Sequence, residues 1–285
     1  MKIKKLISAL VLGSMLVGLS GCNITDFSAE NLLRPPKAVG DEAEIEQLIA
    51  KTADSGYTLK YPKNGKFRSA IIMTDLDGND SNEAVAFFRN SVETSSVHML
   101  VMYSKDNSWE IASDNIFETT DIDSVDFADL TGNGKAEIIV NSTTYTPNVG
   151  KLSCYSYSEG KTNEVGSGQS CSSFVTGDFD NDGTSEIMSL VLYTTENEAL
   201  ASMLDYNEDS KSLYAKAMAN MDPNVVKYKN IAVTKLDNDI TGIVVDGTSA
   251  NEVTNTQVIF YSRDLAILRL SLIHISEPTR QAEIS

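Results

Sequence analysis

The sequence predicts an all-β protein, a β-propeller of four-stranded antiparallel blades with about four blades visible, an incomplete ring and one short N-terminal helix. Short apolar stretches separated by turn residues fill almost the whole chain beyond residue 57. An acidic nine-residue loop recurs between these stretches, beginning at Asp75, Asp129 and Asp178, which are 54 and 49 residues apart. Four short strands repeated about every fifty residues are typical of propeller blades, whereas a β-solenoid repeats over a shorter period.

The N-terminus has the pattern of a targeting segment rather than of a folded element. Three of the first five residues are lysines, and Leu6–Leu19 is almost wholly apolar but too short to span a membrane comfortably. The following residues, Leu19–Cys22, read LSGC and resemble the bacterial lipoprotein cleavage box. This resemblance implies a signal peptide over residues 1–21 and a lipid on Cys22, the first mature residue. An ordinary secretory signal with a chance cysteine is the alternative.

Residues 22–56 are predicted to be a tether followed by a short helix. Asp41–Ala53 is the helical part, because Ile45, Leu48 and Ile49 fall on one face at helical spacing. The next stretch, Tyr57–Tyr61, alternates apolar and polar residues like a strand. We expect it to close the ring in the intact protein, by completing a last blade that is missing from this chain.

The propeller fragment is predicted to cover residues 57–269, with a decayed fourth unit at its end. In that unit Lys235 stands where the other loops have their first aspartate, and no glutamate follows at the ninth position. Gly166–Gly168 is predicted to be a turn. Beyond residue 61 the predicted strands are 71–74, 84–88, 97–103, 109–116, 125–128, 138–145, 152–157, 163–165, 174–177, 187–193, 200–206, 213–218, 231–234, 243–245 and 258–261.

The last segment, residues 270–285, is expected to be non-native. Leu270–Arg280 reads LSLIHISEPTR, the translation of the end sequence of a common sequencing-library adapter, and five further residues follow it. We therefore expect the natural protein to continue differently after Arg269, so that the chain printed here is truncated. A genuine amphipathic tail is the alternative.

The acidic loops have the composition of calcium sites. Calcium prefers six to eight oxygen ligands, and a tight loop can direct positions 1, 3, 5 and 9 inward and offer a carbonyl at position 7. Because the number of charged ligands tunes affinity, we rank the third loop first, the first loop next and the second loop last, and expect no calcium at the fourth. In that order the candidate ligands are Asp178, Asp180, Asp182, Thr184 and Glu186; Asp75, Asp77, Asn79, Ser81 and Glu83; and Asp129, Thr131, Asn133, Lys135 and Glu137.

On these residues the loops resemble the calcium-binding repeats of the FG-GAP and VCBS families, known from the integrin α-subunit propeller. The shared pattern is Asp-x-Asp/Asn-x-Asp/Asn-Gly-x-x-Asp/Glu, over about Phe67–Tyr261. The first loop departs from it, with Asp80 where glycine is usual, and the segment Phe-Gly-Gly-Ala-Pro is absent. Two alternatives remain open: an EF-hand, whose glutamate comes at position 12 between helices, and a metal-free hairpin held by its own side chains.

Charge and motifs narrow the function. The formal charge of −17 disfavours nucleic acid as a partner. The sequence contains no nucleophile elbow, zinc-protease motif or phosphate-binding loop. His98 is expected to pack in a strand rather than catalyse. Cys154 and Cys171 are left either to form a disulfide or to stay as buried thiols.

We therefore expect a surface protein anchored to the cell membrane through Cys22, on its extracytoplasmic face. Its expected role is binding or scaffolding of a protein or glycan on a calcium-stabilised propeller, without catalysis. One alternative is an extracytoplasmic hydrolase whose catalytic residues lie in the missing C-terminal region. Another is a surface protein that uses calcium for stability alone.

Overall fold

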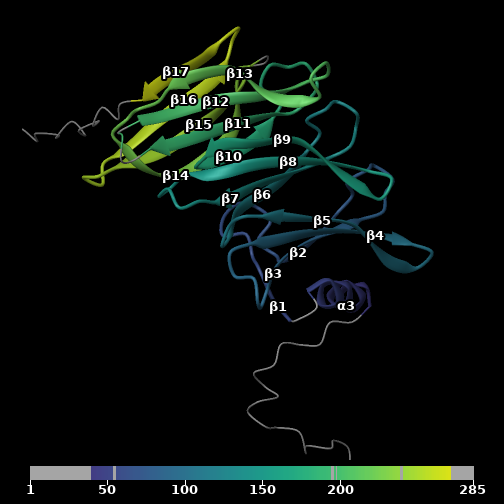
Figure 1. Ribbon diagram of the computed structural model, residues 1–285. Coiled ribbons are helices and arrows are strands. Elements are labelled where there is room, and N and C mark those ends of the chain that lie inside the picture. Colours follow the sequence, from purple (N-terminus) through teal and green to yellow (C-terminus); the bar gives the residue numbers. More distant parts are fainter. Residues whose placement is uncertain (1–39, 54–55, 194–195, 197, 238–239, 271–285) are drawn as a thin grey trace, which may run out of the picture. The chain divides into compact units, whose positions relative to one another are not determined.

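The computed structural model describes residues 40–53, 56–193, 196, 198–237 and 240–270 (Figure 1). The chain divides into two compact units, Met1–Ala43 and Glu44–Ser285. The predicted signal peptide, the lipidation site Cys22 and residues 271–285 lie outside the described residues. Among the residues that are described, no helix is long and apolar enough to cross a membrane.

The described chain is all-β apart from one helix, as predicted. That helix is α3 (Asp41–Ala53), with the predicted bounds, and four antiparallel sheets follow it in chain order. The first sheet contains β1 (Tyr57–Leu59), β2 (Ile71–Thr74), β3 (Glu83–Asn90), β4 (Val97–Lys105) and β5 (Ser108–Phe117). The second contains β6 (Ile122–Ala128), β7 (Glu137–Thr143), β8 (Gly150–Ser158) and β9 (Lys161–Cys171).

The second, third and fourth sheets each consist of four consecutive strands in up-and-down order. Each acidic loop is therefore the first hairpin of its sheet, joining β2 to β3, β6 to β7 or β10 to β11. The third sheet contains β10 (Ser173–Gly177), β11 (Glu186–Tyr193), β12 (Glu198–Asn207) and β13 (Ser212–Asn220). The fourth contains β14 (Val225–Asp237), β15 (Ile240–Ser249), β16 (Thr254–Tyr261) and β17 (Leu265–Leu270).

The sheets bury apolar side chains between successive neighbours, as blades of a propeller do. One apolar cluster joins the first sheet to the second, another joins the second to the third, and a further one joins the third to the fourth. Both faces of β3 are buried: Val85 and Phe87 belong to the cluster shared with the second sheet, while Ala86 points the other way. A near-continuous apolar run such as AVAFF is the consequence, because the side chains of a strand alternate between its faces.

Helix α3 covers the opposite face of the first sheet. Its Ile45, Ile49 and Ala53 are buried together with the β3 and β4 side chains of that face. In this chain β1 pairs with the end of β3, where Leu59 lies opposite Phe88, while β2 pairs with the beginning of β3. That Tyr57–Tyr61 completes a further blade in the intact protein stays a prediction. The short β2 leaves that half of the β3 edge open, and β1 fills it.

Three local predictions need correction. β9 is a full strand of 11 residues, although only a short weak one was expected. Gly166–Gly168 lies inside it rather than in a turn, next to register shifts that a glycine-rich strand accommodates. The fourth sheet also gains β17, which was not predicted and runs to Leu270, one residue past the expected boundary at 269. Its pairing with β16 completes a four-stranded sheet that local pattern alone did not reveal.

Candidate metal sites

The three acidic loops share one buried hydrogen bond. In each loop the glutamate at position 9 is almost fully buried at the start of a strand. Its Oε2 accepts a hydrogen bond from the backbone N–H at position 2. The nitrogen–oxygen distances are 2.8 Å for Leu76 and Glu83, 2.8 Å for Leu130 and Glu137, and 2.7 Å for Phe179 and Glu186. The glutamate thus closes each loop through a backbone hydrogen bond.

Position 2 carries a structural role that the sequence analysis missed. Leu76, Leu130 and Phe179 are all buried, each in an apolar cluster of its own sheet or of two neighbouring sheets. These side chains anchor each loop to the core. The signal was present, because an apolar residue stands directly after the first aspartate in all three loops.

The first and sixth positions shape the turn. The carboxylate of Asp75 accepts hydrogen bonds from the backbone N–H groups of Gly78 at 2.7 Å and Asp80 at 2.9 Å. Desolvation raises the pKa of Asp75, but these backbone donors outweigh it and hold the pKa below its usual value. Asp80 adopts a φ of 64°, as Gly134 and Gly183 do at 79° and 94°. The left-handed conformation expected for Asp80 is therefore present without glycine.

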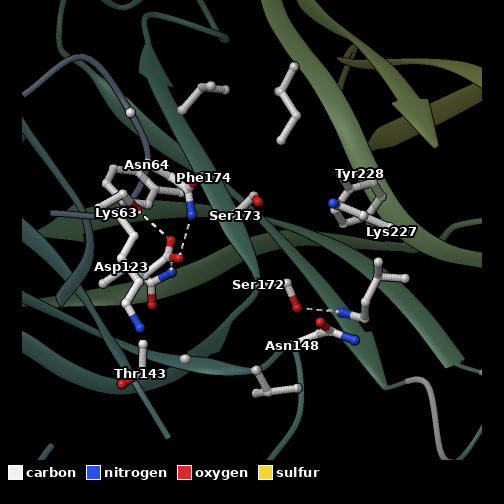
Figure 2. A pocket seen from close by; sticks show the side chains of 18 of the residues that line it. Lys63, Asn64, Asp123, Thr143, Asn148, Ser172, Ser173, Phe174, Lys227 and Tyr228 are labelled. Atoms are coloured by element: carbon white, nitrogen blue, oxygen red, sulfur yellow. Dashed lines mark hydrogen bonds between the residues drawn. The ribbon is translucent and has the colours of Figure 1, made fainter. Parts of the chain in front are cut away.

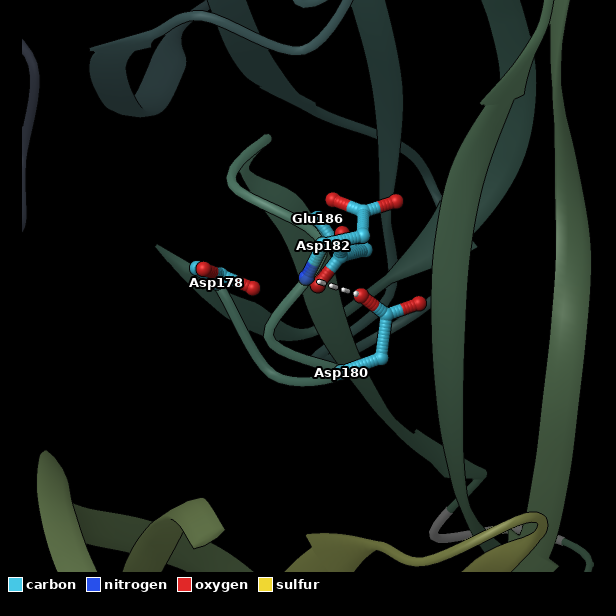
Figure 3. Close-up of side chains that lie close together, drawn as sticks. All are labelled: Asp178, Asp180, Asp182 and Glu186. Atoms are coloured by element: carbon cyan, nitrogen blue, oxygen red, sulfur yellow. Dashed lines mark hydrogen bonds between the residues drawn. The ribbon is translucent and has the colours of Figure 1, made fainter. Parts of the chain in front are cut away.

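The third loop brings all four of its predicted carboxylates together (Figure 3). One oxygen from each of Asp178, Asp180, Asp182 and Glu186 lies within 4.8 Å of the others. Glu186 is 0 % exposed, yet its Oε1 has no hydrogen-bond partner, and neither has the buried Oδ1 of Asp178. Buried oxygens without a donor are costly unless something else satisfies them.

Electrostatics in the third loop are correspondingly unfavourable without a cation. Desolvation raises the pKa of Glu186 to about 8, helped by the neighbouring carboxylates and opposed by the Phe179 N–H. One basic side chain offsets part of this charge. Lys216 on β13 contacts Asp180 and lies 2.8 Å from Asp205, and the two carboxylates hold the pKa of the ammonium above its usual value although desolvation lowers it. Sequence reasoning missed Lys216 because only strand pairing brings β13 to the loop.

The first loop assembles three carboxylates. Oxygens of Asp75, Asp77 and Glu83 lie within 4.8 Å of one another, and the buried Oδ1 of Asp77 has no hydrogen-bond partner. The predicted ligand Asn79 instead accepts a hydrogen bond from the N–H of Ser81 at 2.7 Å. Desolvation raises the pKa of Glu83, again against a backbone donor.

The second loop satisfies its own acceptors. Among the described residues Asp129 and Glu137 belong to no cluster of three or more carboxylates. Asp129 accepts hydrogen bonds from the backbone at Asn133 and Gly134, at 3.1 and 2.8 Å. Thr131 donates its hydroxyl to Glu137 at 3.2 Å. The side chain of Asn133 accepts from the N–H of Lys135 at 2.8 Å, so this loop has the bonding of a metal-free hairpin.

Backbone hydrogen bonds connect the three loops in series. The N–H of Ala136 donates to the carbonyl of Leu76 at 3.1 Å, joining the second loop to the first. The N–H of Ser185 donates to the carbonyl of Asp129 at 2.9 Å, joining the third loop to the second. Gly132 lies so close to the third loop that an added Cβ would stand 2.7 Å from the Cγ2 of Thr184. The second loop therefore lies between the first and third loops and contacts both.

The fourth unit has no loop of this kind. β14 and β15 form a long hairpin in which Asp237 lies opposite Ile240, which leaves room for only two residues between the strands. The third and first loops fit a hard cation such as calcium, because their donors are oxygens, mostly ionised, and several are buried without partners. Oxygen donors with no cysteine or histidine among them disfavour zinc and other softer metals.

The remaining chemically notable side chains lie inside sheets. His98 on β4 is buried, 2.9 Å from Asp114 and stacked on Phe88 with ring centroids 4.8 Å apart. Cys154 and Cys171 are both buried and free, so the disulfide left open above does not form in this structure. Burial raises the pKa of both thiols, which keeps them protonated and unreactive at neutral pH.

Comparison with models of known protein families and with curated proteins finds no match to this chain.

Proposed function

We propose that this chain is a calcium-stabilised binding module of the FG-GAP and VCBS type, held at the outer face of a cell membrane by a lipid on Cys22. Its four sheets would be blades of a propeller, and its role would be to present a rigid surface to a protein or glycan. The observation that carries the proposal is the third loop. There four carboxylates converge, and Glu186 keeps a fully buried oxygen without a partner.

Calcium would contribute rigidity rather than chemistry. Bound at the third loop, it would be held by Asp178, Asp180, Asp182 and Glu186 and would neutralise their clustered charge. Glu186 begins β11 and the loop follows β10, so the ion would tie the first hairpin of the sheet together. Binding to the folded chain alone converts metal affinity into folding stability.

Helix α3 and strand β1 occupy the side of the first sheet at which a ring would close. The face of the first sheet that a closing blade would cover carries α3, and the edge of β3 carries β1. A propeller built from this chain must either leave the first sheet as a terminal blade capped by α3 or move that helix aside.

The test is a calcium titration of the folded protein, in which calorimetry measures binding and thermal melting measures stability. Calcium should raise the melting temperature and EDTA should lower it. Magnesium should do less, because it demands six short ligands in octahedral geometry and gives up water reluctantly. An identical melting temperature in excess EDTA and in millimolar calcium would reject the proposal.

A further inference from the structure

A cavity of about 900 Å³ lies along the first strands of three successive sheets (Figure 2). β6, β10 and β14 supply half of its 28 lining residues, and β10 contacts both of the others. Pockets for small ligands usually measure about 300–1,000 Å³, so the size suits a small molecule or a short oligomer. No acidic loop residue lines it, which makes it distinct from the candidate metal sites.

A well-fixed segment closes one side of the cavity. Lys63–Lys66 lies beside β6, where the N–H of Lys63 donates to the carbonyl of Ile122 at 3.2 Å and that of Asn64 donates to Asp123 at 2.7 Å. The side-chain amide of Asn64 also donates to the carboxylate of Asp123, at 2.8 Å. These bonds hold the wall in place before any ligand arrives, so little ordering entropy is lost on binding.

Neutral hydrogen-bonding side chains form more than a third of the lining. Ten of its 28 residues are serine, threonine or asparagine. Asn141 is only 1 % exposed, and its Oδ1 is buried without a hydrogen-bond partner. Ser172 accepts a hydrogen bond from the N–H of Leu192 at 2.8 Å, which leaves its own hydroxyl hydrogen to donate. Hydroxyls and amides act as donors and acceptors together, which is the bonding character of sugar hydroxyls.

The charge of the cavity opposes that of the chain. Four lysines and two aspartates line it, although the whole chain carries −17. Lys63 is paired with Asp121 and Lys66 with Asp126, at 3.1 and 3.0 Å. Within the described part of the chain, no hydrogen bond or ion pair engages the side chain of Lys227 or Lys229, two exposed residues of β14. The surplus positive charge therefore comes from β14 and faces an otherwise acidic molecule.

Apolar side chains complete the third wall. Phe174 on β10 is half-buried, and Val226 and Val233 on β14 are 37 % and 43 % exposed at the cavity. An aromatic ring and small aliphatic groups suit the C–H faces of pyranose rings, while the polar walls suit their hydroxyls. A polyanion with many charges would be repelled by the acidic surroundings, so the ligand should carry few.

We propose that this cavity binds a short acidic oligosaccharide, with Lys227 and Lys229 contacting its carboxylates and the serine, threonine and asparagine side chains contacting its hydroxyls. The inference names a ligand class for the binding role proposed above, and rests on it. It does not depend on which loops hold calcium.

The probe is a tetrasaccharide with one glucuronate in each disaccharide, titrated calorimetrically into the calcium-saturated protein. The same sugar with its carboxyl groups reduced to alcohols tests the charge, and tetraglutamate tests an acidic peptide instead. The double variant Lys227→Gln/Lys229→Gln is compared with Lys161→Gln/Lys211→Gln, which changes two exposed lysines at hairpin ends away from the cavity. Melting curves with and without calcium are recorded on the same samples, so that loss of the metal-stabilised fold is distinguished from loss of the sugar site.

We expect saturable binding of the acidic sugar that weakens with added salt. Binding should fall roughly tenfold or more in the Lys227→Gln/Lys229→Gln protein, because both charge-assisted hydrogen bonds to the sugar carboxylates are lost, and should stay unchanged in the control. No saturable binding at millimolar sugar, equal binding of the reduced sugar, equal binding of tetraglutamate, or an unaffected double variant would each overturn the assignment.

Discussion

Replacing Glu186 by glutamine should change stability in opposite directions with and without calcium. Glutamine keeps an oxygen that can accept the 2.7 Å hydrogen bond from the N–H of Phe179. It is neutral at every pH, whereas desolvation raises the pKa of Glu186 to about 8, so that this carboxyl must take up a proton when the metal-free chain folds at pH 7. In excess EDTA the Glu186→Gln protein should therefore be more stable than the wild type. Relief of an unsatisfied buried oxygen is worth about 1–3 kcal/mol.

With calcium present, the same variant should lose most of the stabilisation that the third loop supplies. A ligand at 100 times its dissociation constant stabilises the folded state by about 2.7 kcal/mol. A domain of this size gains about 2–4 °C in Tm per kcal/mol, so one site contributes about 5–11 °C. The calcium-induced rise in Tm should shrink by that amount in Glu186→Gln, because a neutral amide is a far poorer calcium ligand.

The assay is calorimetric melting at pH 7 in EDTA and in calcium, with Glu208→Gln as the matched control. Glu208 is an exposed carboxylate at the turn between β12 and β13 of the same sheet, so this control makes the same chemical change outside the loop. It should follow the wild type in both buffers. If Glu186→Gln instead lowered the Tm in EDTA and kept the full calcium-induced rise, Glu186 would be only a structural cap and the metal-site reasoning would be refuted.

Two further predictions concern contacts between sheets. Gly132→Ala should lower stability more than Gly134→Ala, and it should weaken calcium binding at the third loop more. Both glycines have a positive φ, which costs alanine about 1–2 kcal/mol of strain. Only at Gly132 would the added Cβ also meet Thr184. Urea melts with and without calcium measure the difference, and equal losses would show that the second loop does not transmit strain to the third. Asp121→Asn should reduce stability by up to about 1 kcal/mol at pH 6, and by nothing measurable at a pH below the pKa of Asp121 in the folded protein. Desolvation raises the pKa of this partly exposed carboxyl, but Lys60 and Lys63 outweigh it and keep the carboxylate ionised. A carboxyl whose pKa is lowered on folding stabilises the protein at a pH above its ordinary pKa, and this stabilisation is lost as the pH falls through its pKa in the folded state. Urea midpoints of the variant and the wild type at pH 6 and at pH 2–3 measure this dependence. A stability deficit of the variant that persisted at the lower pH would contradict the prediction.

The local sequence pattern was sufficient to predict an element where one face of that element must be buried. The helical spacing of Ile45 and Ile49 predicted α3 with its observed bounds, and both side chains are buried against the first sheet. The strands beside the acidic loops were found for the same reason. β9 was underestimated because its exposed residues are polar and it contains two glycines, so only its pairing with β8 defines it.

The candidate site divides in the same way. Fixed offsets of Asp and Glu predicted the three loops, and the structure gathers the predicted carboxylates of the third and first loops into clusters. The pattern gave no sign of Lys216, which reaches Asp180 from β13, or of the hydrogen bonds that link one loop to the next. Those contacts join residues far apart in the chain, and local spacing carries no information about them.

The residue order by itself determined which hairpins carry acid and which strands have two buried faces, because turn chemistry and side-chain alternation act over a few residues. Only the tertiary structure decided that β1 completes the edge of β3, that α3 occupies the outer face of the first sheet, and that β6, β10 and β14 enclose a lysine-lined cavity. Each of these depends on which apolar surface finds which partner. The pairing of apolar surfaces that buries most apolar area is a property of the whole fold, so no local segment can specify it.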